Sequence, residues 1–187
     1  MGQVSRRGLL VGLASGAVAS TFGVQASATI VRALSLPSLV QGSRRILVVT
    51  ALAAESHFEE LGRRRRIVTD TRVRVEEGLA KADGAERELL VRTLGGAIGR
   101  LGERVHGQAQ LTVGEPCVAF LLQGPDGLHY VNGMAQGHYP LRGDAARRLT
   151  RSPDLPEILG FDESAVKALV GTELSSAGAR IRALVAP

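Results

Sequence analysis

The sequence has a single cysteine, Cys117, and no tryptophan among its 187 residues. An intramolecular disulfide is therefore excluded, so the chain cannot use the cross-links that compensate for a thin core in many small exported domains. Aromatic residues make up only 3% of the chain, which argues against sites that stack bases or sugar rings on aromatic side chains. Hydrophobic residues make up 44%, enough for a core of leucine, valine, isoleucine and alanine. Cys117 lies in the apolar run 117–122, where we expect a buried thiol that packs as a small hydrophobic side chain.

The N-terminus carries the features of an export signal. Arg6 and Arg7 stand directly before an uncharged stretch, Gly8 to Val31, that is rich in glycine, alanine and serine. With two leucines close behind the arginines, this segment resembles the twin-arginine export signal, although a valine stands where that signal prefers a lysine. The resemblance implies export to the periplasm or the outside by the twin-arginine route.

The apolar stretch contains Ala26-Ser27-Ala28, an A-x-A pattern typical of a signal-peptide cleavage site. We expect a leader over 1–28 and a mature chain that starts at Thr29. The alternative is a retained membrane anchor, because the uncharged run is long enough to span a bilayer. Contact with a membrane is expected only if the signal stays uncleaved.

The net positive charge of the chain is small without the expected leader. The formal net charge is +5 and the isoelectric point about 10.3, values that invite a nucleic-acid interpretation. The leader holds two arginines and no acidic residue, so its removal lowers the charge from +5 to +3. The other arginines are spread over predicted strands and turns. Nucleic acid is therefore an unlikely partner by sequence.

The mature chain divides into a short helical lead-in over 29–42, a β domain over 43–141, and an irregular linker with a C-terminal helix over 142–187. Strands are predicted at 44–55, 67–77, 88–94, 109–113, 117–123, 128–134 and 136–141.

Caps and turns frame these strands. Ser35 is the predicted cap of the first helix, and Asp162 the cap of a helix that begins at Glu163, continued as one bent helix or two short ones. The polar segment 56–66 is a predicted connection, and 124–127, Gly-Pro-Asp-Gly, a predicted hairpin turn.

The strand at 67–77 has the clearest pattern in the sequence. Ile67, Thr69, Thr71, Val73 and Val75 alternate with mostly charged residues. Alternation with a period of two indicates one packed and one solvated face, which is typical of antiparallel sheets.

The order of these motifs resembles a group of small exported bacterial domains of unassigned function. The resemblance covers Leu36 to Leu141 and rests on a Val-Thr-Asp strand that ends in Val-Glu-Glu, a strand that ends in Gly-Gly, a Gly-Glu turn, and the closing Val131–Gly137 segment. That group is similar in layout to the netrin-like module of tissue inhibitors of metalloproteinases. The resemblance implies a mainly β fold: a small antiparallel OB-like (netrin-like) barrel with a short N-terminal helix and a C-terminal helical segment.

The inhibitory chemistry of that module does not transfer to this chain. In the inhibitors, a cysteine at the mature N-terminus chelates the protease zinc and disulfides hold it in place. Here the expected N-terminus is Thr29, and one cysteine cannot form a disulfide within the chain.

Two segments are candidate binding surfaces. The glycine-rich segment 95–107 lacks the Gly-Lys-Ser/Thr ending of a P-loop and is predicted to be a long surface loop, a common place for function on a β scaffold. The four consecutive arginines could contact an anionic surface or an extracytoplasmic protein partner; alternatively they are a solvated turn that discourages edge pairing. The candidate residues are Gly96, Arg100, Arg104 and His106 in the loop, and Arg63, Arg64, Arg65 and Arg66 in the arginine run.

No catalytic set, metal site or cofactor is predicted. The four histidines, His57, His106, His129 and His138, lack the spacing of a zinc motif. We therefore expect an exported, non-enzymatic binding or regulatory domain. The alternatives are a periplasmic enzyme or cofactor-binding protein, favoured if the last three histidines gather around a carboxylate, and a protease-inhibitor-like domain.

Overall fold

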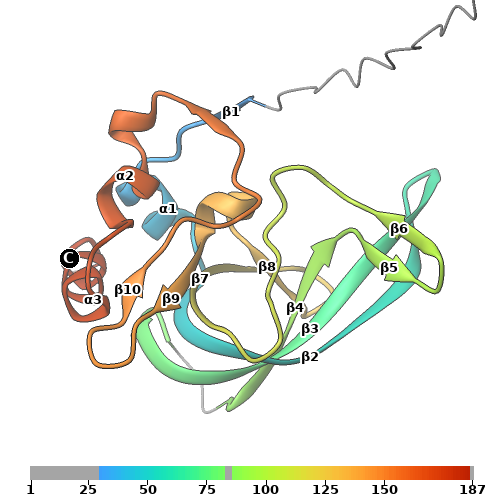
Figure 1. Cartoon of the computed structure of the whole chain (residues 1–187), viewed down its shortest axis with the longest axis horizontal. Coiled ribbons are helices and arrows are strands. Elements are labelled where there is room, and N and C mark those ends of the chain that lie inside the picture. The colour runs from blue at the N-terminus through green and yellow to red at the C-terminus, as the bar shows by residue number, and fades with distance from the viewer. Residues whose placement is uncertain (1–29, 83–85, 186–187) are drawn as a thin grey trace, which may run out of the picture.

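The computed structural model describes residues 30–82 and 86–185 (Figure 1). Of the described residues, 48% lie in strands and 19% in helices, so the fold is mainly β. The expected leader and its cleavage site lie outside the described residues. None of the helices in residues 30–82 and 86–185 has the length and hydrophobicity of a membrane-spanning helix.

Most strands follow one another in the middle of the chain, and the α-helices lie near its two ends. In chain order they are β1 (Ile30–Arg32), α1 (Leu36–Gly42), β2 (Arg45–Leu61), β3 (Arg64–Ala80), β4 (Glu88–Leu94), β5 (Gly96–Ile98), β6 (Leu101–Glu103), β7 (Pro116–Gln123), β8 (His129–Val131), η1 (Met134–Gly137), β9 (His138–Arg142), β10 (Arg148–Leu149), β11 (Glu157–Leu159), η2 (Phe161–Glu163), α2 (Ala165–Leu169) and α3 (Leu174–Ala183).

Five strands close into a ring-like sheet in the order β7-β2-β3-β4-β8, with β8 returning to β7. All these pairings are antiparallel except that of β4 with β8, where Val91 lies opposite His129 in a parallel pair. Register shifts between β2 and β3, the last between Ala51 and Ala53, help this long hairpin to curl. Strands β9 and β10 extend the sheet outward from β7.

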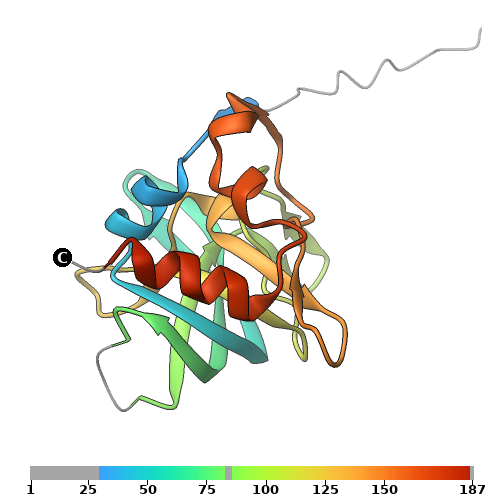
Figure 2. The same cartoon turned by 90° about the vertical axis from the view of Figure 1, so that its left-hand side faces the viewer.

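Strands β2 and β7 separate two hydrophobic cores. Leu47 and Val49 of β2 point into the ring, whereas Ile46 and Val48 point outward against the helices. Figure 2 shows α1, α2 and α3 together on that outer side. A strand buried on both faces carries a continuous apolar run instead of an alternating one, which explains the unbroken apolar stretch in the sequence.

Several predicted elements are confirmed. Helix α1 begins after Ser35, whose hydroxyl accepts a hydrogen bond from the Ser38 N–H. Strand β4 has the predicted bounds, and β7 matches within one residue. In β3, Thr71 and Val73 are buried while Arg72 and Arg74 are exposed, as the alternation predicted.

The prediction of a connection at 56–66 is wrong. Strand β2 continues to Leu61 and β3 begins at Arg64, so the turn is only Gly62 and Arg63. These ends form a two-stranded arm that extends past β4 and β7 (Figure 1). Because neither face of the arm is as fully buried as the ring, its sequence lacks the apolar signature of a core strand.

Further boundaries differ from the sequence prediction. Of the predicted strands 128–134 and 136–141, only 129–131 (β8) and 138–141 (within β9) are strand, and η1 lies between them. The segment 109–113 forms no strand: Val113 makes one bridge to Ala51, and the side chains of Ala109 and Leu111 pack inside the ring. The loop 95–107 contains the hairpin β5–β6. Near the C-terminus, Ser164 rather than Asp162 caps a helix, because its hydroxyl accepts from the Lys167 N–H at 3.1 Å. Helices α2 and α3 are the two short helices that the sequence allowed.

Candidate functional site

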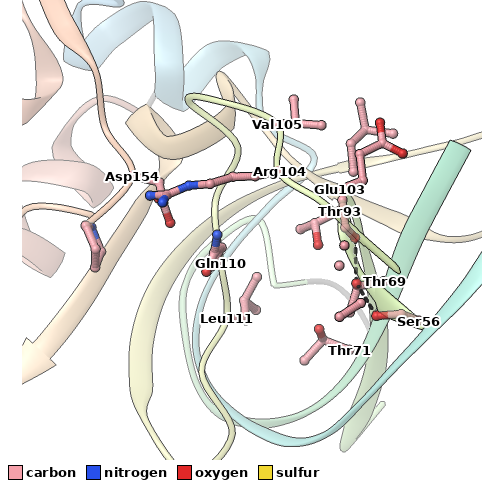
Figure 3. Close-up of a pocket in the computed structure, with 16 residues that line it drawn as sticks. Ser56, Thr69, Thr71, Thr93, Glu103, Arg104, Val105, Gln110, Leu111 and Asp154 are labelled. Atoms are coloured by element: carbon pink, nitrogen blue, oxygen red, sulfur yellow. Dashed lines mark hydrogen bonds and ion pairs between the residues drawn. The ribbon is translucent and has the colours of Figure 1, made fainter. Parts of the chain in front are cut away.

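A cavity of about 720 Å³ lies at one mouth of the ring (Figure 3). Its floor and one wall come from the inner faces of β2, β3 and β4. Its roof is the segment 95–111, which crosses the mouth, and Pro153 and Asp154 complete the rim. The predicted binding loop therefore does cover a cavity.

A row of hydroxyl groups crosses the wall of this cavity. Ser56 lies opposite Thr69 in the β2–β3 register, and Thr69 lies opposite Thr93 in the β3–β4 register. Residues paired across antiparallel strands point to the same face, so the three side chains line up, with Thr71 two residues along β3. Figure 3 shows these four side chains facing Gln110 and Leu111 of the crossing segment.

The hydroxyls differ in what they bind. Thr69 Oγ1 donates to the Gly95 carbonyl at 2.7 Å and lies 2.8 Å from Ser56 Oγ. The side chains of Thr71, Thr93 and Gln110 make no hydrogen bond within the described residues, although Thr71 is only 1% exposed and Thr93 only 7%. Polar groups placed in this way can donate to and accept from a bound molecule.

Two glycines let the roof approach the hydroxyl row. Gly95 has a φ of 91° and donates its N–H to the Ile67 carbonyl at 2.8 Å. Gly96 has a φ of 138°, and a Cβ there would lie 2.3 Å from Thr69 Oγ1. The candidate residue Gly96 therefore lets β5 lie directly on the sheet.

Two ion pairs hold the roof in place on opposite sides. The Glu103 carboxylate accepts the Ile67 N–H at 2.8 Å and pairs with Arg66. These contacts lower the pKa of Glu103, with the Ile67 N–H as the largest cause. The next residue, Arg104, pairs with Asp154, whose side chain is 8% exposed. Each pair is electrically balanced, so the roof adds no net charge to the cavity.

The structure brings together only part of the predicted site. Gly96 and Arg104 line the cavity, and Arg66 contacts it through Glu103. The remaining candidates lie outside it: Arg63, Arg64 and Arg65 on the arm, Arg100 in the β5–β6 turn, and His106 on the exposed surface. Sequence reasoning missed the hydroxyl row, although its signal was visible as Thr69 and Thr71 on the buried face of an alternating strand.

The histidines neither gather around a carboxylate nor lie uniformly on the surface. His138 is buried, its Nδ1 lies 2.9 Å from the buried Ser152 Oγ, and burial lowers its pKa to about 4. His129 is also buried, and its pKa is lowered by burial and by Arg45. In the ranges that the structure describes, no group of three or more His, Cys, Asp or Glu residues could hold a metal ion.

The Cys117 thiol is inside the ring, 3% exposed. Burial raises its pKa to about 12, with smaller contributions from Glu76 and Glu115. A thiolate nucleophile needs a lowered pKa and access to substrate, so this thiol is part of the core.

Comparison of the chain with protein-family models, curated proteins and solved structures found no match.

Proposed function

We propose that this chain is an exported, non-enzymatic binding domain that holds a small polar molecule in the cavity at the mouth of the ring. The observation that carries this proposal is the set of polar side chains without partners that converge there. The hydroxyls of Thr71 and Thr93 and the carboxamide of the exposed Gln110 face one volume, where they can donate hydrogen bonds to a bound molecule and accept hydrogen bonds from it.

The chemistry of the walls favours a ligand that is polar but carries no net charge. The arginines and carboxylates of the roof pair with each other, which leaves hydroxyl and amide groups as the available contacts. The volume falls within the roughly 300–1,000 Å³ of small-molecule sites. The lining has no aromatic residue, so the ligand is held by hydrogen bonds and shape rather than by stacking.

The strand order supports the OB-type, netrin-like layout as part of this proposal. The ring has the order β2-β3-β4-β8-β7, in which β8, the last of the five strands along the chain, pairs in parallel with β4 and antiparallel with β7; this is the order expected of an OB-type barrel. The proposed location, periplasmic or secreted, rests on the leader over 1–28.

The arm carries a second candidate function, an inhibitor-like contact with an extracytoplasmic protein or an anionic surface. Arg63, Arg64 and Arg65 are exposed there, beside the partly exposed Phe58 and Leu61. Arg65 lies 4.1 Å from the centre of the Phe58 ring. Replacement of Arg63, Arg64 and Arg65 by serine should abolish retention of the chain on anionic vesicles or its inhibition of an extracellular protease. Retention and inhibition unchanged by these substitutions would remove the arm from the proposal.

The cavity proposal is tested with uncharged polar probes. Glycerol, glucose, acetamide and proline are titrated into the chain, and binding is followed by protein-observed NMR. Thr71→Val and Thr93→Val keep the side-chain shape but remove the hydroxyl, and each should weaken the best probe at least about fivefold. Thr112→Val is the matched control, because Thr112 is exposed and lies outside the cavity. Failure of all four probes to bind, or equal binding by the three variants, would overturn the proposal.

A further inference from the structure

A second cavity, of about 210 Å³, lies at the seam between β4 and β8. These strands pair over only two positions, Val91 with His129 and Arg92 with Tyr130. Past that point they diverge and leave a gap in the ring. Its apolar lining is Leu61, Val68, Leu94 and Val131.

Two polar side chains that line this cavity, those of Thr93 and Gln108, make no hydrogen bond within the described residues, and Gln108 is the one with both a donor and an acceptor. Gln108 is only 8% exposed, and its side chain lines the cavity. Its backbone N–H donates to the Val105 carbonyl at 3.1 Å, but its carboxamide makes no hydrogen bond within the described residues. The carboxamide therefore offers a donor and an acceptor to which a molecule bound in the cavity can hydrogen-bond.

The Arg92 guanidinium and the Tyr130 hydroxyl at the rim are already engaged. Arg92 donates to both carboxylate oxygens of Asp70, at 2.6 and 2.7 Å, and also pairs with Glu59. The Tyr130 hydroxyl donates to Asp126 at 2.6 Å. The Arg92 guanidinium thus lies near the three carboxylates of Asp70, Glu59 and Asp126. This excess of negative charge disfavours an anionic ligand.

We propose that this cavity binds a small uncharged ring compound that bears one hydroxyl or amide group, with that group hydrogen-bonded to Gln108. An apolar cavity of about 150 Å³ holds benzene, so 210 Å³ accommodates a ring of that size with one polar substituent. The apolar side chains of the cavity contact the ring of the ligand. The Gln108 carboxamide favours a ligand whose substituent can form a hydrogen bond. The site is distinct from the mouth cavity in ligand chemistry, although Thr93 and Leu94 line both.

The test compares three probes of similar size on the unmodified chain by protein-observed NMR. Phenol should bind at millimolar concentrations, toluene at least about fivefold more weakly because it leaves Gln108 unpaired, and benzoate more weakly than phenol because of the rim carboxylates. Equal affinity for phenol and toluene, binding of toluene alone, or a preference for benzoate would overturn the proposal.

Substitutions locate the binding. Gln108→Leu should remove the preference for phenol over toluene. Leu94→Trp should fill the cavity and abolish binding of both, whereas Leu90→Trp, on an exposed position of the same strand, should leave it intact. Phenol binding that survives Leu94→Trp in a folded chain would place the ligand elsewhere and refute the site. The probe order on the unmodified chain remains decisive if a variant does not fold.

Discussion

Gly96→Ala provides the sharpest test of how the roof is seated on the sheet. The added Cβ would lie 2.3 Å from Thr69 Oγ1 and 2.4 Å from Ser56 Oγ, far inside van der Waals contact. The two hydroxyls could rotate away only by breaking the bonds that join Ser56, Thr69 and the Gly95 carbonyl. The substitution therefore forces either a shift of β5 or the loss of this hydrogen-bond chain.

The expected cost follows from two contributions. A φ of 138° at residue 96 is unfavourable for alanine by about 1–3 kcal/mol. Loss of one or two hydrogen bonds adds about 1 kcal/mol each. Gly96→Ala should therefore lower the free energy of unfolding by about 2–5 kcal/mol.

Urea denaturation followed by circular dichroism measures this cost. Gly99→Ala is the matched control, because Gly99 has a φ of 60° and a Cβ added there would meet no atom within 4 Å; it should cost about 1–2 kcal/mol. In a background of Ser56→Ala and Thr69→Ala, the cost of Gly96→Ala should fall towards the backbone contribution, because only the close approach to the Cβ of residue 56, at 3.1 Å, remains. Equal costs for the two glycines, with no change in that background, would refute the close packing of β5 on the hydroxyl row.

Three other predictions concern export, the thiol and acid stability. Replacement of Arg6 and Arg7 by lysine should block export, and the exported wild-type chain should begin at Thr29 by intact-mass measurement; a chain of full mass would contradict cleavage. Cys117 should resist iodoacetamide at pH 8 in the folded chain and react fully in urea, because burial raises its pKa to about 12; rapid labelling of the folded chain would show an accessible thiol. The pKa of His138 is lowered from 6.5 to about 4 in the fold, so the unfolded chain takes up the proton first and stability is lost as the pH falls from 6.5 to 4, by about 2–3 kcal/mol. His138→Phe should flatten that loss in urea titrations, and an unchanged slope would assign it to other groups.

The fold was predictable where burial leaves a local pattern. The alternation around Thr71 and Val73 predicted which face of β3 is packed, and the apolar run after Pro116 predicted a buried strand. Closure of the ring was not predictable in this way, because β4 and β8 are distant in sequence and meet over two residue pairs. The arm was missed because its residues lie beyond the ring, where a strand can be polar on both faces.

The site was predictable only in outline. Glycine richness marked 95–107 as a segment of unusual backbone freedom, and the structure places it over the cavity. The hydroxyl row depends on the registers of β2, β3 and β4, which bring Ser56, Thr69 and Thr93 together from three strands. The register between strands that are distant in sequence is a property of the whole sheet, so no local sequence motif could predict it.

The short strand β1 constrains the order in which the chain can fold. Ile30 to Arg32 pair in parallel with Glu157 to Leu159, so the start of the described chain is held by a segment close to its end. During synthesis this pair cannot form until residue 159 has left the ribosome, even if the ring has already assembled. The pairing of β1 with β11 can therefore form only when translation is nearly complete. On the proposed export route, β1 follows the leader directly. Its pairing with β11 therefore indicates that the whole domain has been synthesised and has folded.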